Sequence, residues 1–126
     1  MLHQHKKLGL WLPCGGHVEP NELPDEAAVR EVLEESGVPV ALVGERALEV
    51  EVPRQLVRPR GVQLETIYEG HEHIDLIYFA RPVEDYDGAL LEEDSSLGWY
   101  DQEALAGLEL TEEIQAWTEL LFSELG

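Results

Sequence analysis

The most regular pattern of hydrophobic and polar positions lies between Pro24 and Ser36. A proline opens this segment, two acidic residues follow it, and Gly37 comes directly after the last turn. Each of these features is typical of a helix terminus. The pattern therefore predicts a helix over residues 24–36, whose core face holds Ala28, Val29, Val32 and Leu33.

Shorter apolar runs predict strands on both sides of this helix. They cover residues 8–12, 16–19, 48–52, 62–68 and 74–80, with a short strand at 98–100, whereas residues 53–61 and 85–94 are predicted loops. Asp101 is expected to cap a brief helix that ends near Gly107. Thr111 begins a final helix with an apolar stripe formed by Ile114, Trp117, Leu121 and Leu125. This order of elements predicts one mixed α/β domain over residues 1–126.

The chain is strongly acidic, with 8 Lys+Arg against 27 Asp+Glu and a formal net charge of -19. Nucleic acids and anionic membranes are bound through clustered Lys and Arg, so this charge argues against both as partners. The single cysteine, Cys14, cannot form an internal disulfide. No run approaches the roughly 20 apolar residues of a membrane span, and the first residues lack the apolar core of a signal peptide. A cytoplasmic location is the expectation.

Three glutamates near the end of the predicted helix carry the candidate chemistry. Glu31, Glu34 and Glu35 are three and four residues apart, so their carboxylates crowd one helix face. Like charges at these spacings destabilise a helix by about 0.2–0.5 kcal/mol per pair, and they also oppose the helix dipole. A bound divalent cation would reverse both effects, and ligands that are all oxygen atoms favour Mg²⁺ or Mn²⁺. A solvated acidic face is the alternative for an isolated cluster.

The segment from Gly16 to Val38 resembles the Nudix box, G-x5-E-x7-R-E-U-x-E-E-x-G-U with U bulky and aliphatic, at every defined position. The resemblance implies an α/β/α sandwich with a mixed sheet. It also implies a hydrolase that uses Mg²⁺ or Mn²⁺ to cleave nucleoside diphosphates linked to another moiety. The residues that it assigns to the metal are the carbonyl of Gly16 and the carboxylates of Glu31, Glu34 and Glu35. One of these glutamates would deprotonate the attacking water, and Arg30 would pair with Glu22 to support the loop.

Residues outside the box extend this candidate site. In many relatives an acidic residue from a late loop completes the site, and Glu93, between Glu92 and Asp94, is the candidate for that role. An exposed acidic loop is the alternative. His17, next to Gly16, is a candidate phosphate contact, with packing of the loop as the alternative.

Two further groups of polar side chains suggest ligand contacts. Arg54 and Arg58 lie in the loop after residue 52, and guanidinium groups match phosphate oxygens, so this loop could hold the distal part of a nucleotide. Ion pairs with surplus carboxylates are the equal alternative. His71, His73 and Asp75 fall on one face of a predicted strand, where they could bind a metal or contact a substrate. Polar alternation on a half-exposed strand explains them more simply.

The chain departs from the family pattern near its first residues, because relatives usually carry about one more strand before the segment 2–12. Either the chain has lost an opening strand or the sequence starts late, and a missing strand would expose a sheet edge that favours a homodimer. The favoured function is a metal-dependent pyrophosphohydrolase whose substrate is a nucleotide sugar, ADP-ribose or a nucleoside triphosphate. A non-catalytic nucleotide-binding or regulatory module is the alternative. Hydrolysis of RNA ends is disfavoured by the charge.

Overall fold

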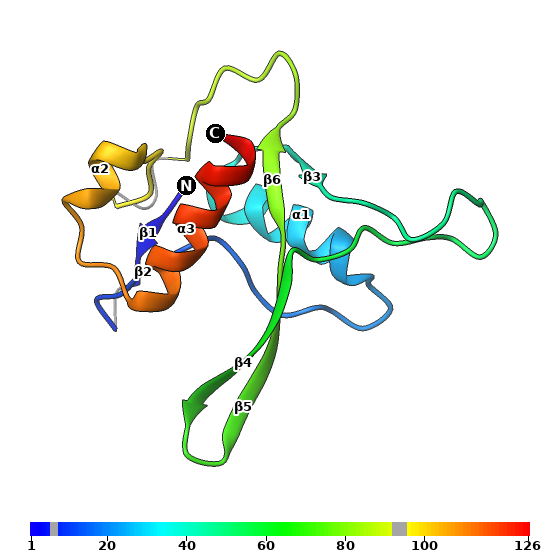
Figure 1. Cartoon of the computed structure of the whole chain (residues 1–126), viewed down its shortest axis with the longest axis horizontal. Helices are drawn as coiled ribbons and strands as arrows, with labels where there is room; N and C mark the ends of the chain where they lie inside the picture. Colours follow the sequence, from blue (N-terminus) through cyan, green and yellow to red (C-terminus); the bar gives the residue numbers. More distant parts are fainter. Residues whose placement is uncertain (6–7, 92–95) are drawn as a thin grey trace.

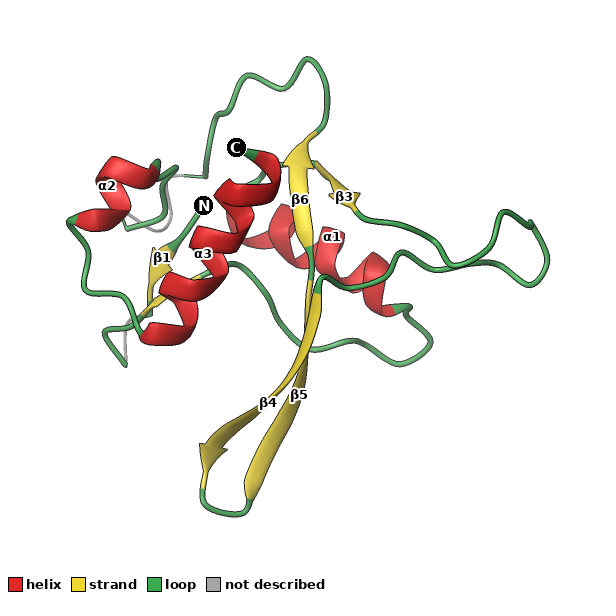
Figure 2. Cartoon of the chain, viewed as in Figure 1, coloured by secondary structure: helices red, strands yellow, loops and turns green. Residues whose placement is uncertain are grey.

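The computed structural model describes residues 1–5, 8–91 and 96–126. The body of the molecule holds the helices and the short strands, while one long hairpin and the segment 44–60 extend away from it (Figure 1; Figure 2). In chain order the elements are β1 (His3–Gln4), β2 (Trp11–Leu12), α1 (Pro24–Ser36), β3 (Val40–Val43), β4 (Gly61–Tyr68), β5 (His71–Ile77), β6 (Phe79–Pro82), α2 (Gln102–Ala106) and α3 (Glu112–Leu125).

The strands of the described residues pair in three separate antiparallel ladders, β1 with β2, β3 with β6, and β4 with β5. The α/β class is confirmed, but the expected single mixed sheet is not found in this part of the chain. The predicted strand over residues 74–80 breaks at Tyr78. As a result β5 pairs with β4, from Gly61↔Ile77 to Tyr68↔His71, whereas β6 pairs with β3.

Helix α1 has the predicted bounds, and its end is fixed by local hydrogen bonds. Gly37 has a φ of 77°, the left-handed conformation that favours glycine, and its N–H donates to the Leu33 carbonyl at 2.8 Å. The predicted core face is partly wrong, because Leu33 is 48% exposed while Ala27 is buried. The helix packs on β3.

Two predicted strands are absent from their positions. Residues 16–19 and 48–52 have no strand structure, and of the predicted strand 8–12 only Trp11–Leu12 pairs. The alternating apolar residues Leu48, Val50 and Val52 are exposed, so no strand of the described chain covers their side chains. Strands β1 and β3 were not predicted, because two to four residues are too short to show a period.

The core of the described chain forms where the N-terminal strand meets the C-terminal helices. Leu2, Leu105 and Ile114 are buried together, and Trp11, Tyr100, Leu108, Leu110 and Phe122 surround them. The predicted caps are confirmed, since Asp101 accepts from the Ala104 N–H and Thr111 accepts from the Ile114 N–H. No helix in the described part of the chain is long and apolar enough to cross a membrane.

Candidate active site

Arg30 joins the loop before α1 to the helix. Its Nε donates to Glu22 Oε2 at 2.6 Å, and its Nη2 donates to Glu22 Oε1 and to the carbonyl of His17, both at 3.0 Å. The hydrogen bonds from Arg30 hold the pKa of Glu22 below its ordinary value. Glu22 Oε1 also accepts from the Glu19 N–H at 3.0 Å. The expected support of the loop by Arg30 and Glu22 is thus present in the structure.

The same guanidinium faces two of the three glutamates of the box. Arg30 Nη1 lies 2.8 Å from Glu31 Oε1 and 3.0 Å from Glu34 Oε2. Its hydrogen bond with Glu22, followed by that with Glu31, raises the pKa of Arg30 above its ordinary value. A single positive charge therefore offsets part of the repulsion between carboxylates that the helix spacing imposes.

The loop backbone comes close to these carboxylates at Gly15 and Gly16. A Cβ added to Gly16 would lie 2.4 Å from the Glu31 carboxyl carbon, which is closer than real Cβ atoms approach. The N–H of Gly15 donates to Glu35 Oε2 at 3.1 Å. Positive φ angles occur at other glycines, so the consequence of a side chain at position 16 would be a displacement of the flexible end of Glu31 rather than backbone strain.

Glu35 differs from the other box glutamates in its surroundings. Burial raises the pKa of the Glu35 carboxyl, hydrogen bonds from the Cys14 thiol and the Gly15 N–H oppose this rise, and the negative charge of Glu31 adds to it. A carboxylate that holds a proton more readily than free glutamate suits a general base. Neither the partner of Cys14 nor the Gly15 donor could be predicted from the sequence, because both contacts depend on how the loop folds over α1.

The donor set at this site has the chemistry of a hard-metal site. The carbonyl of Gly16 and the carboxylates of Glu31, Glu34 and Glu35 are all oxygen ligands, which suit Mg²⁺ or Mn²⁺. Within residues 1–5, 8–91 and 96–126, no group of three or more His, Cys, Asp or Glu side chains is arranged to hold a metal ion. One oxygen of Glu31 and one oxygen of Glu34 instead lie within 3.0 Å of Arg30.

The predicted substrate contacts lie apart from the carboxylates. Arg54 is 3.4 Å from Glu26 in the first turn of α1, in an exposed ion pair, and Glu26 is nine residues, or about 13 Å along the helix, from Glu35. The Arg58 side chain is exposed. His17, in contrast, lies beside the carboxylate cluster through the bond of its carbonyl with Arg30. Glu93 lies outside the described residues, as do Glu92 and Asp94.

Two comparisons with known proteins show the family to which this chain belongs. A family model of the NUDIX domain matches residues 1–121. The crystal structure of a NUDIX-family hydrolase from Clostridium perfringens superposes with a TM-score of 0.80 at 31% identity, covering 99% of this chain and 88% of that chain. The chain therefore belongs to the Nudix hydrolase family, and the predicted Nudix-type fold is confirmed.

Sequence similarity to a curated relative is more local. A Bacillus subtilis (strain 168) protein named "Putative 8-oxo-dGTP diphosphatase" is 50% identical over 42 residues. This segment represents 33% of the present chain and 28% of that protein. The chain thus aligns with less than a third of the length of this curated relative.

Proposed function

We propose that this protein is a metal-dependent pyrophosphohydrolase that cleaves a phosphoanhydride bond in a small nucleoside diphosphate derivative. The observation that carries the proposal is the seating of Gly16 against the carboxylate of Glu31, with Arg30 fixing the same loop through Glu22. The three box glutamates lie in the last two turns of α1, and Gly16 lies against one of them, which supports a metal site formed by the loop and the helix.

The residues of the chain have distinct roles in this proposal. Mg²⁺ or Mn²⁺ would be held by Gly16, Glu31, Glu34 and Glu35. Such an ion, when bound, neutralises negative charge on the diphosphate and lowers the pKa of a bound water. Glu35 is the proposed acceptor of the proton of the attacking water, and the burial that raises the pKa of its carboxyl above the ordinary value supports this choice. Arg30 keeps the loop in place and does not itself touch the substrate. Glu93 is retained as a further acidic residue of the site.

The substrate proposal combines the relative's name with the charge of the chain. A nucleoside triphosphate with an oxidised purine is the first substrate to test, since the Bacillus subtilis relative is named for that activity. Nucleotide sugars and ADP-ribose contain the same phosphoanhydride bond. Arg54 and Arg58 lie on the segment 44–60, and in a chain of net charge -19 they offer cations to the distal part of such a substrate. His17, next to Gly16, is the proposed phosphate contact.

A second candidate function is a non-catalytic nucleotide-binding module. The observation that favours it is the pairing of Glu31 and Glu34 with Arg30, whose single positive charge already offsets part of their negative charge in the structure. A module of this kind would bind a nucleotide without consuming it. Turnover, rather than binding, therefore separates the two functions.

The deciding experiment measures product release by liquid chromatography. The panel comprises intact and oxidised nucleoside triphosphates, ADP-ribose, nucleotide sugars and dinucleoside polyphosphates, each with Mg²⁺, Mn²⁺ or a chelator. The matched variants are Glu35→Gln in the site and Glu119→Gln on the exposed surface of α3. Metal-dependent cleavage that Glu35→Gln abolishes and Glu119→Gln retains supports the hydrolase. Nucleotide binding without any cleavage supports the second candidate.

We also propose that the protein forms a homodimer. The face of the β4–β5 hairpin formed by Val62, Leu64, Ile74 and Leu76 supports this, because these apolar side chains are 37–73% exposed. A second copy of the chain that covered these side chains would remove their apolar area from water, which is favourable by about 25 cal/mol per Å². Within the described chain β4 and β5 contact mainly each other, so a partner can reach the hairpin.

A further inference from the structure

Two histidines on the β4–β5 hairpin lie side by side. His71 and His73 are two residues apart on β5, so their side chains point to the same face of the ladder. Their Nε2 atoms are 3.0 Å apart. Two imidazole nitrogens at this distance cannot both carry a proton, or both present a lone pair, without repulsion. One shared proton, or one shared cation, resolves this repulsion.

The distance between the two Nε2 atoms matches the distance between neighbouring ligand atoms of a metal ion. A divalent transition metal binds imidazole nitrogen at about 2.0–2.1 Å, which places two neighbouring ligands roughly 3 Å apart. The Nε2 pair already has this separation. Ions such as Zn²⁺ bind imidazole nitrogen well, whereas Mg²⁺ and Ca²⁺ prefer oxygen ligands. The pair therefore favours a metal of a different class from the one that the box glutamates suit.

Neighbouring rings hold the two imidazoles in this arrangement. Tyr68 stacks on His71, with ring centroids 4.8 Å apart and an interplanar angle of 13°. His17 meets the His73 ring edge-on at a centroid distance of 5.3 Å. Rings that are already fixed lose less conformational entropy when they bind. Since His17 directly follows Gly16, these contacts also connect the hairpin to the loop of the candidate active site.

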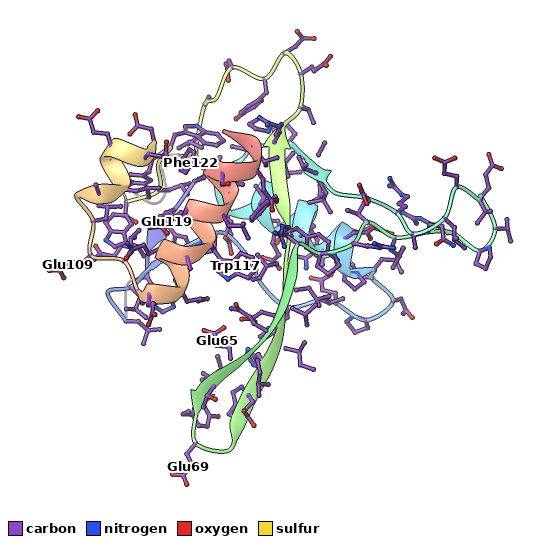
Figure 3. The ribbon with its side chains drawn as sticks, in the orientation of Figure 1. Glu65, Glu69, Glu109, Trp117, Glu119 and Phe122 are labelled. Atoms are coloured by element: carbon purple, nitrogen blue, oxygen red, sulfur yellow. The ribbon has the colours of Figure 1, made fainter. Side chains whose placement is uncertain are left out.

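The charges around the pair favour a cation. Glu65 is directly opposite His73 in the ladder. Its hydrogen bond with Asp75, together with burial and the negative charges of Asp75 and Glu113, raises the pKa of Glu65 to about 7. Figure 3 shows Glu65 on the hairpin between Glu69, near the tip, and Trp117 of α3. Carboxylates that repel one another in this way gain from a positive charge placed near them.

We propose that His71 and His73 form a two-nitrogen chelate for a divalent transition-metal ion of the Zn²⁺ class. Water completes the coordination, because no third His, Cys, Asp or Glu of the described residues is arranged with them to hold a metal ion. The site is separate from the box glutamates and does not depend on the proposed hydrolase activity. An ion bound here fixes the hairpin beside His17 and the Gly16 loop.

Calorimetric titration with Zn²⁺ in excess Mg²⁺ tests this proposal, since Mg²⁺ then saturates the oxygen ligands of the box. The titrated proteins are the wild type, His71→Gln, His73→Gln and the control His5→Gln, a histidine on the N-terminal segment. Because the second ligand of a chelate binds as an intramolecular event, each hairpin variant is expected to bind Zn²⁺ at least about tenfold more weakly than the wild type. The control keeps the wild-type affinity. Equal affinity in all four proteins overturns the proposal.

A second measurement on the unmutated chain removes any dependence on how the variants fold. Histidine side-chain nitrogen resonances are followed during the same Zn²⁺ titration. The Nε2 signals of His71 and His73 are expected to shift together. A shift confined to His3 or His5 contradicts the chelate. Neither result depends on turnover, so the substrate panel and the Zn²⁺ titration can fail independently.

Discussion

Replacing Gly16 with alanine tests the close approach of loop and helix on which the candidate active site depends. The new Cβ would lie 2.4 Å from the Glu31 carboxyl carbon, against 3.4 Å for an ordinary van der Waals contact. Loop or carboxylate must therefore move by about 1 Å, and a misplacement of about 1 Å at a catalytic group can cost roughly 100-fold in rate. We expect Gly16→Ala to lower kcat by about this factor.

Global stability is expected to respond much less to this substitution. Position 16 is exposed in a loop, and a Gly→Ala change also reduces the entropy of the unfolded chain by the equivalent of about 0.4–1 kcal/mol. The free energy of unfolding, measured by urea denaturation, should thus stay within about 1 kcal/mol of the wild type. This separates a local displacement of Glu31 from a general loss of fold.

Gly15→Ala is the matched control in the same loop. A Cβ at Gly15 has no atom within 4 Å, and alanine keeps the N–H that donates to Glu35. We expect kcat of Gly15→Ala to remain within about twofold of the wild type, since nothing is displaced. The assay is steady-state turnover of the best substrate of the panel across a range of Mg²⁺ concentrations. Equal losses in both variants, or full activity of Gly16→Ala, would refute the reasoning.

Three further predictions concern the box, the hairpin carboxylates and the hairpin surface. Glu34→Gln should reduce turnover by orders of magnitude with an unchanged circular dichroism spectrum, because a proposed metal ligand is lost rather than a core contact; wild-type turnover would remove the site assignment. The pKa of Glu65 is raised from 4.5 to about 7, so the contribution of this carboxyl to stability is fully present below pH 4.5 and is lost as the pH rises through 7. Between pH 4 and 8, the urea midpoint of the wild type should therefore fall more steeply than that of Glu65→Gln. Parallel curves for the two proteins would contradict this. Ile74 is 73% exposed on the apolar face of the hairpin, and Ile74→Lys should dissociate the proposed homodimer, as measured by sedimentation velocity. A wild type that is already monomeric would rule the dimer out.

The sequence by itself determined the features that depend on residues close together in the chain. The bounds of α1, the caps at Asp101 and Thr111, and the β4 strand follow from local spacing and capping chemistry. The family also followed from local sequence, because the Nudix box occupies one continuous segment. A predicted pairing, that of Arg30 with Glu22, spans eight residues and was confirmed for the same reason.

Only the tertiary structure decided how distant segments meet. The alternation of residues 48–52 predicts a strand, yet a strand needs a partner, and none lies beside that segment in the described chain. The ion pair of Arg54 with Glu26, the thiol contact of Cys14 with Glu35, and the contact of His17 with His73 likewise join segments up to 56 residues apart. Hydrogen bonding and burial between such segments depend on how the whole chain packs. Local periodicity contains no information about that packing, and for this reason the carboxylates could be found from the sequence while their neighbours could not.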